Sequence, residues 1–260
     1  MSEKPIPSKS PRSPSAAVKA GRGNLGGSTA EAALAERAIM QGRPPLLADG
    51  DARNPGLSAF KSVYERFGLS RPLSEEASVL KEWFSEAFGM AAEQKKSLLV
   101  DVGGGDRTFE LWAKEEGIIS LAESIGLEVT GLFMCGPQVG DLDYIKRLWE
   151  SELFRPKRAL LVFNDWSVPV GHDPDRAFGN LTENPFFAQM SDCKLGFLRI
   201  PKLSILPAII ESGLSFQQVM ESAPRPCGTP FDVLRRAQVK RWFDLIESNI
   251  VAEKVESWLP

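Results

Sequence analysis

Short, nearly continuous apolar runs alternate along the chain with segments whose apolar residues recur at helical spacing. The runs are LLAD (46–49), SLLVD (97–101), LEVTGLFMC (127–135), RALLVFN (158–164) and LGFLRIP (195–201). Such runs are typical of strands buried on both faces, and their alternation with helices indicates a parallel sheet. We therefore expect an α/β fold of three layers, with a mostly parallel sheet and helices on both faces.

Three segments carry the clearest helical patterns. In STAEAALAERAIMQ, Ser28 precedes Glu31 by three residues, which is the spacing of a capping box, and Gly42 follows the segment. A second segment, SEEASVLKEWFSEAFGMAAEQ, has an apolar face that we expect to join the core, with Leu80, Trp83, Phe84, Ala87 and Phe88. From about residue 231 the pattern predicts a closing helix or a pair of helices.

Length and composition favour one domain. The 260 residues, 43% of them hydrophobic, are enough to bury one substantial core, so we expect a single α/β domain over 19–260. Residues 1–18 are rich in Pro, Ser and Lys and predict a disordered basic tail. At most a very short strand is expected at SPSAAVKA.

The net charge of -3 excludes a globally basic nucleic-acid coat, so any DNA contact must be local.

The cysteines and the absence of long apolar runs bear on location. The three cysteines have no CxxC spacing, which argues against a zinc site and against a secreted disulfide framework. No apolar run reaches the roughly 18 residues that a membrane span needs. We therefore expect a cytoplasmic protein.

The apolar runs end in a set of residues that a parallel sheet would bring to one edge: Asp49, Asp101, Pro137, Asn164 and Pro201. Ligands in such sheets bind at the carboxyl ends of the strands. An acid at the end of a buried strand needs a metal, an N–H group or a cation as its partner. Asp49 and Asp101 are therefore candidate site residues, although each could simply cap the turn that follows.

The stretch AGRGNLGGST (20–29) allows two interpretations. Read literally, Gly21, Gly23 and Gly26 form GxGxxG before a helix, and Asp49 lies a little over twenty residues further on. This is the spacing of a dinucleotide fingerprint, which would make the protein an oxidoreductase.

The other interpretation compares RGNLGGST, from Arg22 to Thr29, with the deviant Walker A motif KGGxGK[ST]T. A helix follows, then LLADGDARNPGLS with an Asp-x-Asp at Asp49 and Asp51, and then SLLVDVGGG with Asp101 in the Walker B position. In this order of elements, residues 21–215 resemble the ParA/MinD family of partition and positioning ATPases, which have a P-loop NTPase fold.

The resemblance implies a site for ATP and Mg²⁺. It assigns nucleotide contacts to Gly23, Asn24, Gly26, Gly27, Ser28, Thr29 and, at the adenine base, Asn164. It assigns Mg²⁺ to Ser28, Asp49 and Asp101, and catalytic roles to Asp49 and to Arg22, which stands where the family has a lysine that reaches across a dimer. Arg22 could equally be an exposed loop residue, and Ser28 and Thr29 could be helix caps.

The sequence departs from the motif at Gly27, where the family has the phosphate-binding lysine. Losing a cation from phosphoryl transfer typically costs orders of magnitude in rate. We therefore expect ATP hydrolysis to be weak or absent, and the ATP and Mg²⁺ site could be lost altogether. Whether the protein is an enzyme stays open.

The function that this resemblance implies is plasmid partition, stability or conjugative mobilisation, through a homodimer and a partition or mobilisation partner. A non-hydrolysing adaptor that uses the fold as a binding platform is the alternative, beside the oxidoreductase. Non-specific DNA binding is a further expectation for the basic cluster, Arg235, Arg236, Lys240 and Arg241, which could instead be a solvated helix face paired with nearby acids.

Overall fold

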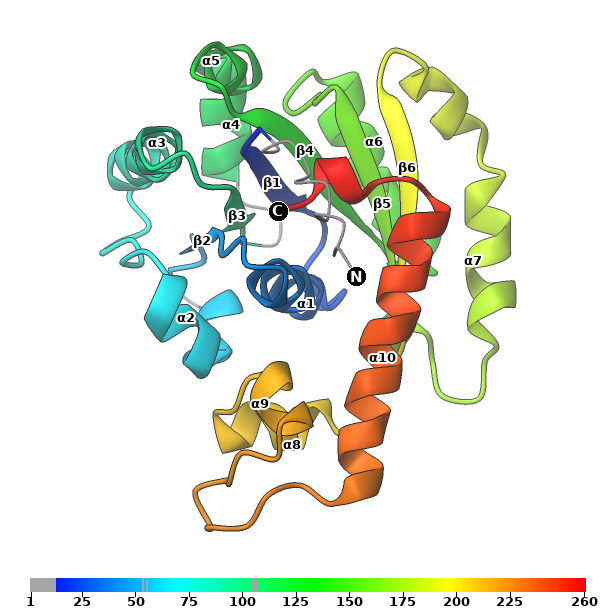
Figure 1. The fold of residues 1–260 in the computed structure, drawn as a ribbon. Coiled ribbons are helices and arrows are strands. Elements are labelled where there is room, and N and C mark those ends of the chain that lie inside the picture. Colours follow the sequence, from blue (N-terminus) through cyan, green and yellow to red (C-terminus); the bar gives the residue numbers. More distant parts are fainter. Residues whose placement is uncertain (1–12, 53, 55, 104–106) are drawn as a thin grey trace, which may run out of the picture.

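Six parallel strands form one sheet in the order β2-β3-β1-β4-β5-β6 (Figure 1). The computed structural model describes residues 13–52, 54, 56–103 and 107–260. The strands are β1 (Ser15–Ala20), β2 (Leu46–Asp49), β3 (Leu98–Asp101), β4 (Glu128–Cys135), β5 (Arg158–Asn164) and β6 (Lys194–Ile200). The predicted α/β fold with a parallel sheet is confirmed.

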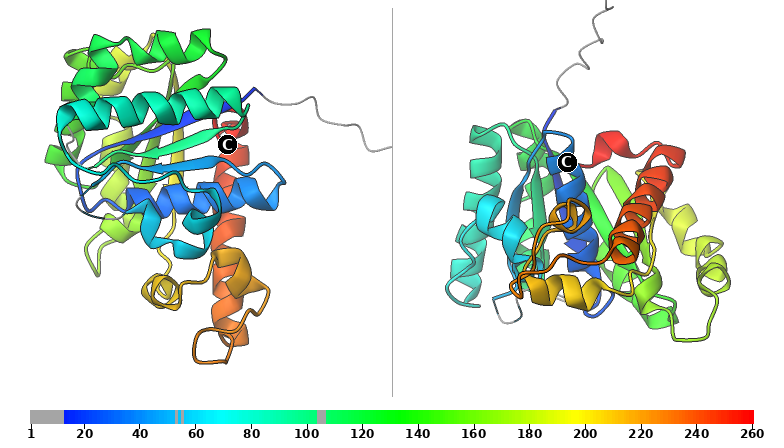
Figure 2. Two further views of the ribbon diagram at one scale, coloured as in Figure 1. Left: turned by 90° about the vertical axis from the view of Figure 1, so that its left-hand side faces the viewer. Right: turned by 60° about the horizontal axis from the view of Figure 1, so that its bottom comes forward.

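Helices cover both faces of the sheet. One face packs on α3 (Ala77–Glu93), α4 (Arg107–Glu115), α5 (Ile118–Ser124), α6 (Val139–Glu150) and α7 (Pro174–Thr182). The other packs on α1 (Gly27–Met40), α2 (Lys61–Phe67), α8 (Leu206–Ser212), α9 (Phe216–Met220) and α10 (Val233–Ala252). The left view of Figure 2 shows the sheet between α3 and α1. No helix within the described part of the chain is long and apolar enough to cross a membrane.

The central strand β1 begins earlier than the sequence suggested. Residues 15–18, which we assigned to the disordered tail, form most of this strand, while residues 1–12 lie outside the described part of the chain. Ala16, Ala17 and Val18 are fully buried because β1 lies between β3 and β4 and under helices on both faces. Small side chains are sufficient to fill the space around this central strand. In the sequence, the neighbouring Pro, Ser and Lys residues made the segment resemble a disordered tail.

The start of α1 also differs from the expectation. A capping box at Ser28 and Glu31 is wrong: the helix begins at Gly27, and its N-cap is Gly26, in the left-handed region with φ 73°. Ser28 instead donates a hydrogen bond to Asp101, and Glu31 is fully buried. Both side chains are therefore directed toward the sheet.

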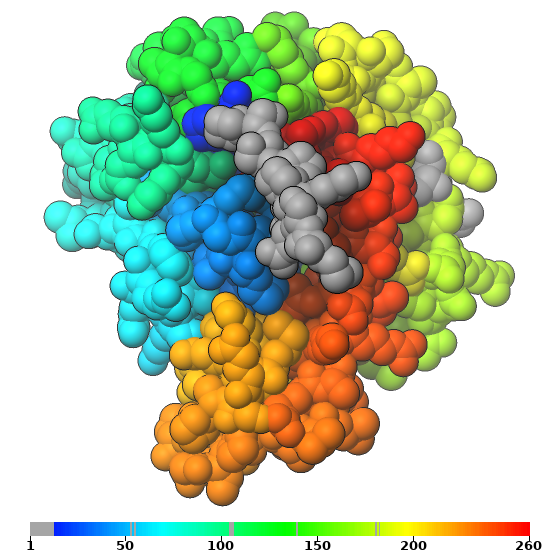
Figure 3. Space-filling model, in the orientation of Figure 1, coloured from blue at the N-terminus to red at the C-terminus, as the bar shows by residue number. Residues whose placement is uncertain are grey.

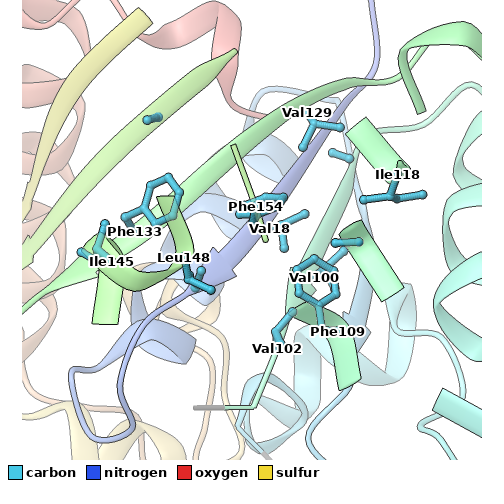
Figure 4. Close-up of a cluster of buried hydrophobic side chains, with 14 of the residues drawn as sticks. Val18, Val100, Val102, Phe109, Ile118, Val129, Phe133, Ile145, Leu148 and Phe154 are labelled. Atoms are coloured by element: carbon cyan, nitrogen blue, oxygen red, sulfur yellow. The ribbon is translucent and has the colours of Figure 1, made fainter. Parts of the chain in front are cut away.

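The predicted apolar face of α3 is buried as expected. Its Phe84 stacks on Trp112 of α4, with ring centroids 5.3 Å apart, and meets Phe109 edge-on at 5.1 Å. Figure 4 shows Phe109 and Phe154 among side chains from the central strands, including Val18 and Val100. This cluster packs against the central strands, whose carboxyl ends carry the candidate functional site.

The other end of the chain forms a projection. Helices α8 and α9, the connection after them and the first turns of α10 protrude at one end of the molecule, where Figure 3 shows them in gold and orange. The long α10 lies within the C-terminal region that the sequence predicted to be helical, and packs on β6 and α9.

Candidate functional site

Three charged residues lie side by side at the carboxyl edge of the sheet. Lys19 of β1 is in register with Asp101 of β3, and Asp101 is in register with Asp49 of β2. Residues in register on neighbouring strands point to the same face, which is here the face covered by α1. The sheet therefore brings together the two predicted acids and a lysine that the sequence analysis did not single out.

Asp101 is almost fully buried and has a complete set of partners. Its Oδ1 forms an ion pair with the ammonium of Lys19. Its Oδ2 accepts hydrogen bonds from the Ser28 hydroxyl at 2.6 Å and from the Leu57 N–H at 3.1 Å. A buried carboxylate requires this kind of compensation, because an uncompensated charge is strongly unfavourable in the interior.

Asp49 holds the segment that follows β2. Its Oδ2 accepts from the N–H groups of Gly56 at 3.1 Å and Ser58 at 2.8 Å, and its Oδ1 accepts from Asp51 at 3.3 Å. Burial raises the pKa of Asp49, although the bonds from Ser58 act to lower it. Asp49 and Asp101 together therefore fix residues 56–58 over the site.

Glu31 of α1 is a third acid at this cluster. It is fully buried, and neither carboxyl oxygen has a hydrogen-bond partner among the described residues. Burial, followed by the charge of Asp101, raises the pKa of Glu31 well above its ordinary value, although Lys19 acts to lower it. Glu31 thus lies beside the ion pair of Lys19 and Asp101, where burial favours the protonated form of its carboxyl group.

The loop from Gly21 to Thr29 forms one wall of a cavity of about 280 Å³, which is also lined by Lys19. Two of its residues have left-handed backbone conformations, Asn24 with φ 66° and Gly26 with φ 73°. Gly26 is in addition packed against Asn164, since a Cβ there would lie 2.1 Å from the Asn164 Nδ2. The left-handed residues and the contact with Asn164 therefore fix the backbone conformation of the loop.

Asn164, the predicted contact to a base, anchors this loop. Its Nδ2 donates to the Gly26 carbonyl at 3.1 Å, and its Oδ1 accepts from the Trp166 N–H at 3.0 Å. The second contact caps the turn that follows β5. A direct contact of Asn164 to a base stays a prediction.

A side chain at position 27 would meet Lys19. A Cβ at this position would lie 2.4 Å from Cδ and 3.1 Å from Cγ of Lys19. The aliphatic part of Lys19 therefore passes directly over Gly27. The space in which a lysine of a Walker A motif would begin is occupied by the stem of a lysine from β1.

A second cavity of about 230 Å³ lies next to the first and shares Asn24, Gly26 and Thr29 with it. The rest of its lining is largely apolar: Asn164, Trp166, Ile200, Pro201, Leu203, Leu206 and Trp242. A cavity at a glycine-rich loop with a lysine, beside a cavity whose lining is largely apolar, suits a phosphorylated aromatic ligand.

Arg22, the predicted catalytic arginine, is half exposed and bonded within its own chain. Its Nη1 lies 3.2 Å from Oδ1 of Asp141, whose Oδ2 accepts from the Gln138 N–H at the start of α6. A reach across a dimer by Arg22 stays a prediction.

The basic cluster on α10 does not form one uniform face. Arg235 pairs with Asp232, with 3.4 Å between Nε and Oδ2, and Arg236 donates to Ser222. Lys240 and Arg241 are exposed. The first pair agrees with the solvated face that we considered, and DNA binding stays a prediction.

Comparison with known proteins identifies the fold. No protein-family model and no curated protein matches the sequence. Among solved structures, chloroplast FtsY from Physcomitrella patens is similar over 87% of this chain, with 14% identity and a TM-score of 0.51. The signal recognition particle receptor FtsY from Elizabethkingia anophelis is similar over 88%, with 13% identity and a TM-score of 0.50. The fold is that of a P-loop NTPase.

These similarities show the fold alone. The chain spans 65% of each FtsY chain. The MinC:MinD complex from Aquifex aeolicus is a more distant match, with 13% identity, a TM-score of 0.45 and coverage of 87% of this chain and 95% of that one.

The strand order also separates the two interpretations of the glycine-rich loop. In the dinucleotide-binding fold the order is 3-2-1-4-5-6, so the strand with the ribose-binding acid lies directly beside β1. Here β3 lies between β1 and β2, and Asp49 is one strand further away. The arrangement argues against the oxidoreductase alternative.

Proposed function

We propose that the protein binds ATP in the two adjoining cavities and acts as a ParA/MinD-like nucleotide-dependent switch with weak or absent hydrolysis. The single observation that carries the proposal is the loop from Gly21 to Thr29. It connects the buried central strand β1 to α1, it lines a cavity, and it places Ser28 against Asp101 at the carboxyl edge. Loops of this kind bind phosphate through backbone N–H groups and the helix N-terminus.

The second cavity supports a nucleotide rather than a free phosphate. It begins at the loop residues that both cavities share, and its lining includes Trp166 and Trp242. Trp166 is partly exposed, with the Lys202 ammonium 4.9 Å from its ring centroid. An aromatic and aliphatic lining suits a base, and the polar loop suits the phosphates.

The arrangement as it stands does not fit a magnesium ion at the predicted ligands Ser28, Asp49 and Asp101. Both oxygens of Asp101 are engaged, one by an ammonium and the other by two hydrogen-bond donors. The Asp49 oxygens accept from backbone N–H groups. We therefore propose nucleotide binding that does not depend on Mg²⁺, and we assign no reaction step to the metal.

Partition, stability or conjugative mobilisation of a plasmid is the biological role we propose for this switch, through a homodimer and a partner protein. The support is the resemblance of the sequence to the ParA/MinD family. An adaptor without nucleotide is the second candidate, because the ion pair of Lys19 and Asp101 already satisfies the charges of the site.

The test is equilibrium binding of ATP, ADP and NADH to the purified protein, with and without Mg²⁺. Gly26→Ala places a Cβ against Asn164 and should weaken ATP binding at least tenfold, because the loop loses its curvature. Gly117→Ala is the matched control: Gly117 is also a left-handed helix N-cap, with φ 59°, but a Cβ there meets nothing within 4 Å.

ATP binding that is lost in Gly26→Ala and kept in Gly117→Ala would support the proposal. If neither ATP nor ADP binds the unaltered protein, nucleotide binding is refuted and the adaptor remains. Preference for NADH would restore the oxidoreductase.

A further inference from the structure

The loop lacks a positive charge of its own at the position where phosphate loops carry one. In such loops a lysine after the last glycine reaches the β and γ phosphates. That position is Gly27, and the charged side chain within the loop itself, Arg22, points to Asp141. A nucleoside triphosphate bound here would need a cation from elsewhere.

Lys19 is placed to provide it. Its stem crosses Gly27 with Cδ only 2.4 Å from the Cβ that a side chain would have, and it lines the same cavity as the loop. Beyond Cδ only Cε and the ammonium remain. The Cγ and Cδ of Lys19 therefore occupy the space in which a side chain at position 27 would begin, and the ammonium lies beyond them at Asp101.

The surroundings of Lys19 keep it charged. Burial acts to lower the pKa of Lys19, but Asp101 and then Glu31 raise it, and the net direction is upward. Its side chain is only 12% exposed. Asp101 does not depend on Lys19 alone, because it also accepts from Ser28 and Leu57. The ammonium can therefore leave Asp101 for another anion without leaving that carboxylate unpaired.

We propose that Lys19, on strand β1, supplies the phosphate-binding charge that the loop lacks at position 27. On binding of a nucleoside triphosphate, the ammonium turns from Asp101 to the oxygens of the terminal phosphates. This inference rests on the proposed nucleotide binding and adds the residue that discriminates triphosphate from nucleoside.

The experiment compares ATP and adenosine binding to the full chain and to a set of variants. Lys19→Met keeps the aliphatic stem and removes the charge. We expect ATP affinity to fall at least thirtyfold and adenosine affinity to change less than threefold. Lys96→Met, at an exposed lysine before β3, is the control and should bind ATP as the unaltered protein does.

The third variant exchanges the two positions. Lys19→Ala combined with Gly27→Lys moves the lysine into the loop and removes the stem that blocks it. We expect this protein to regain ATP affinity to within tenfold of the original, whereas Lys19→Ala alone should not. Thermal melting shows which variants are folded. If Lys19→Met alone is unstable, the double variant Lys19→Met with Asp101→Asn replaces it, because this variant removes both charges of the ion pair.

Equal ATP affinity in the original protein and in folded Lys19→Met would overturn the role of Lys19 and leave nucleotide binding intact. An equal loss of ATP and adenosine would also overturn it, because the effect would then be structural. Absence of ATP binding to the original protein would instead refute the proposed function.

Discussion

Glu36 should make the stability of the protein fall as the pH rises from about 4.5 to 7. The residue lies on α1, is 2% exposed, and accepts hydrogen bonds at 2.8 Å from the N–H groups of Phe216 and Gln217 at the start of α9. Burial raises the pKa of Glu36 from its ordinary value of 4.5 to about 7, although the two N–H groups act to lower it. The folded protein therefore binds a proton more tightly than the unfolded chain.

The size of the effect follows from the two pKa values. Below pH 4.5 the group is protonated in both states, and the stability contribution is complete. As the pH rises through about 7, folding has to keep a buried carboxylate ionised, and the contribution is lost. At about 1.4 kcal/mol for each pH unit, the interval from 4.5 to about 7 corresponds to ~3.5 kcal/mol of unfolding free energy.

Glu36→Gln isolates this contribution, because an amide does not titrate in this range. We would measure urea unfolding by tryptophan fluorescence at pH 5, 6, 7 and 8. The free-energy difference between the original protein and Glu36→Gln should shift by about 2.5 kcal/mol between pH 5 and pH 8, in favour of the variant at high pH. Other buried acids with raised pKa values, such as Glu31, are present in both proteins and cancel.

Glu86→Gln, at an exposed position of α3, serves as the control and should run parallel to the original protein at every pH. If Glu36→Gln also runs parallel, burial of Glu36 does not control its ionisation, and the reasoning is wrong.

Two further predictions concern packing, and urea unfolding measures both. Gly56→Ala should lower the free energy of unfolding by about 1 to 3 kcal/mol, because a Cβ there would lie 2.6 Å from Oδ2 of Asp101. The control is Gly89→Ala in α3, where an added Cβ meets nothing within 4 Å. This variant should instead raise the free energy of unfolding by about 0.5 to 1 kcal/mol. Trp112→Ala should lower the free energy of unfolding by about 3 to 5 kcal/mol, since this side chain is 2% exposed and stacks on Phe84. A decrease below about 1 kcal/mol in Gly56→Ala or in Trp112→Ala would contradict the packing described.

The sheet could be predicted from the sequence because five of its six strands are apolar runs separated by helical segments. The strand β1 was the exception, since Ala16 and Ala17 are small and adjoin a polar segment. Local patterns also misled at α1, where Ser28 and Glu31 have the spacing of a capping box. Their real environment is set by β3, which is more than sixty residues away in sequence.

The charged core of the site was the least predictable part. Asp49 and Asp101 were found because they end apolar runs, but their neighbour Lys19 has no such signal. What distinguishes Lys19 is its register with Asp101, which depends on which strands pair. The sequence did contain one weaker indication, which is a lysine within the short segment SAAVKA that forms a strand buried on both faces.

The close approach of Lys19 to Gly27 also constrains how this sequence could have evolved. The stem of Lys19 fills the space at the loop, so a lysine at position 27 would require Lys19 to move, and loss of both lysines would leave Asp101 without its cation partner. The two positions should therefore change together among homologues, as lysine with glycine or as a non-lysine residue with lysine. A search that requires lysine at the end of the loop would pass over every chain of the first kind.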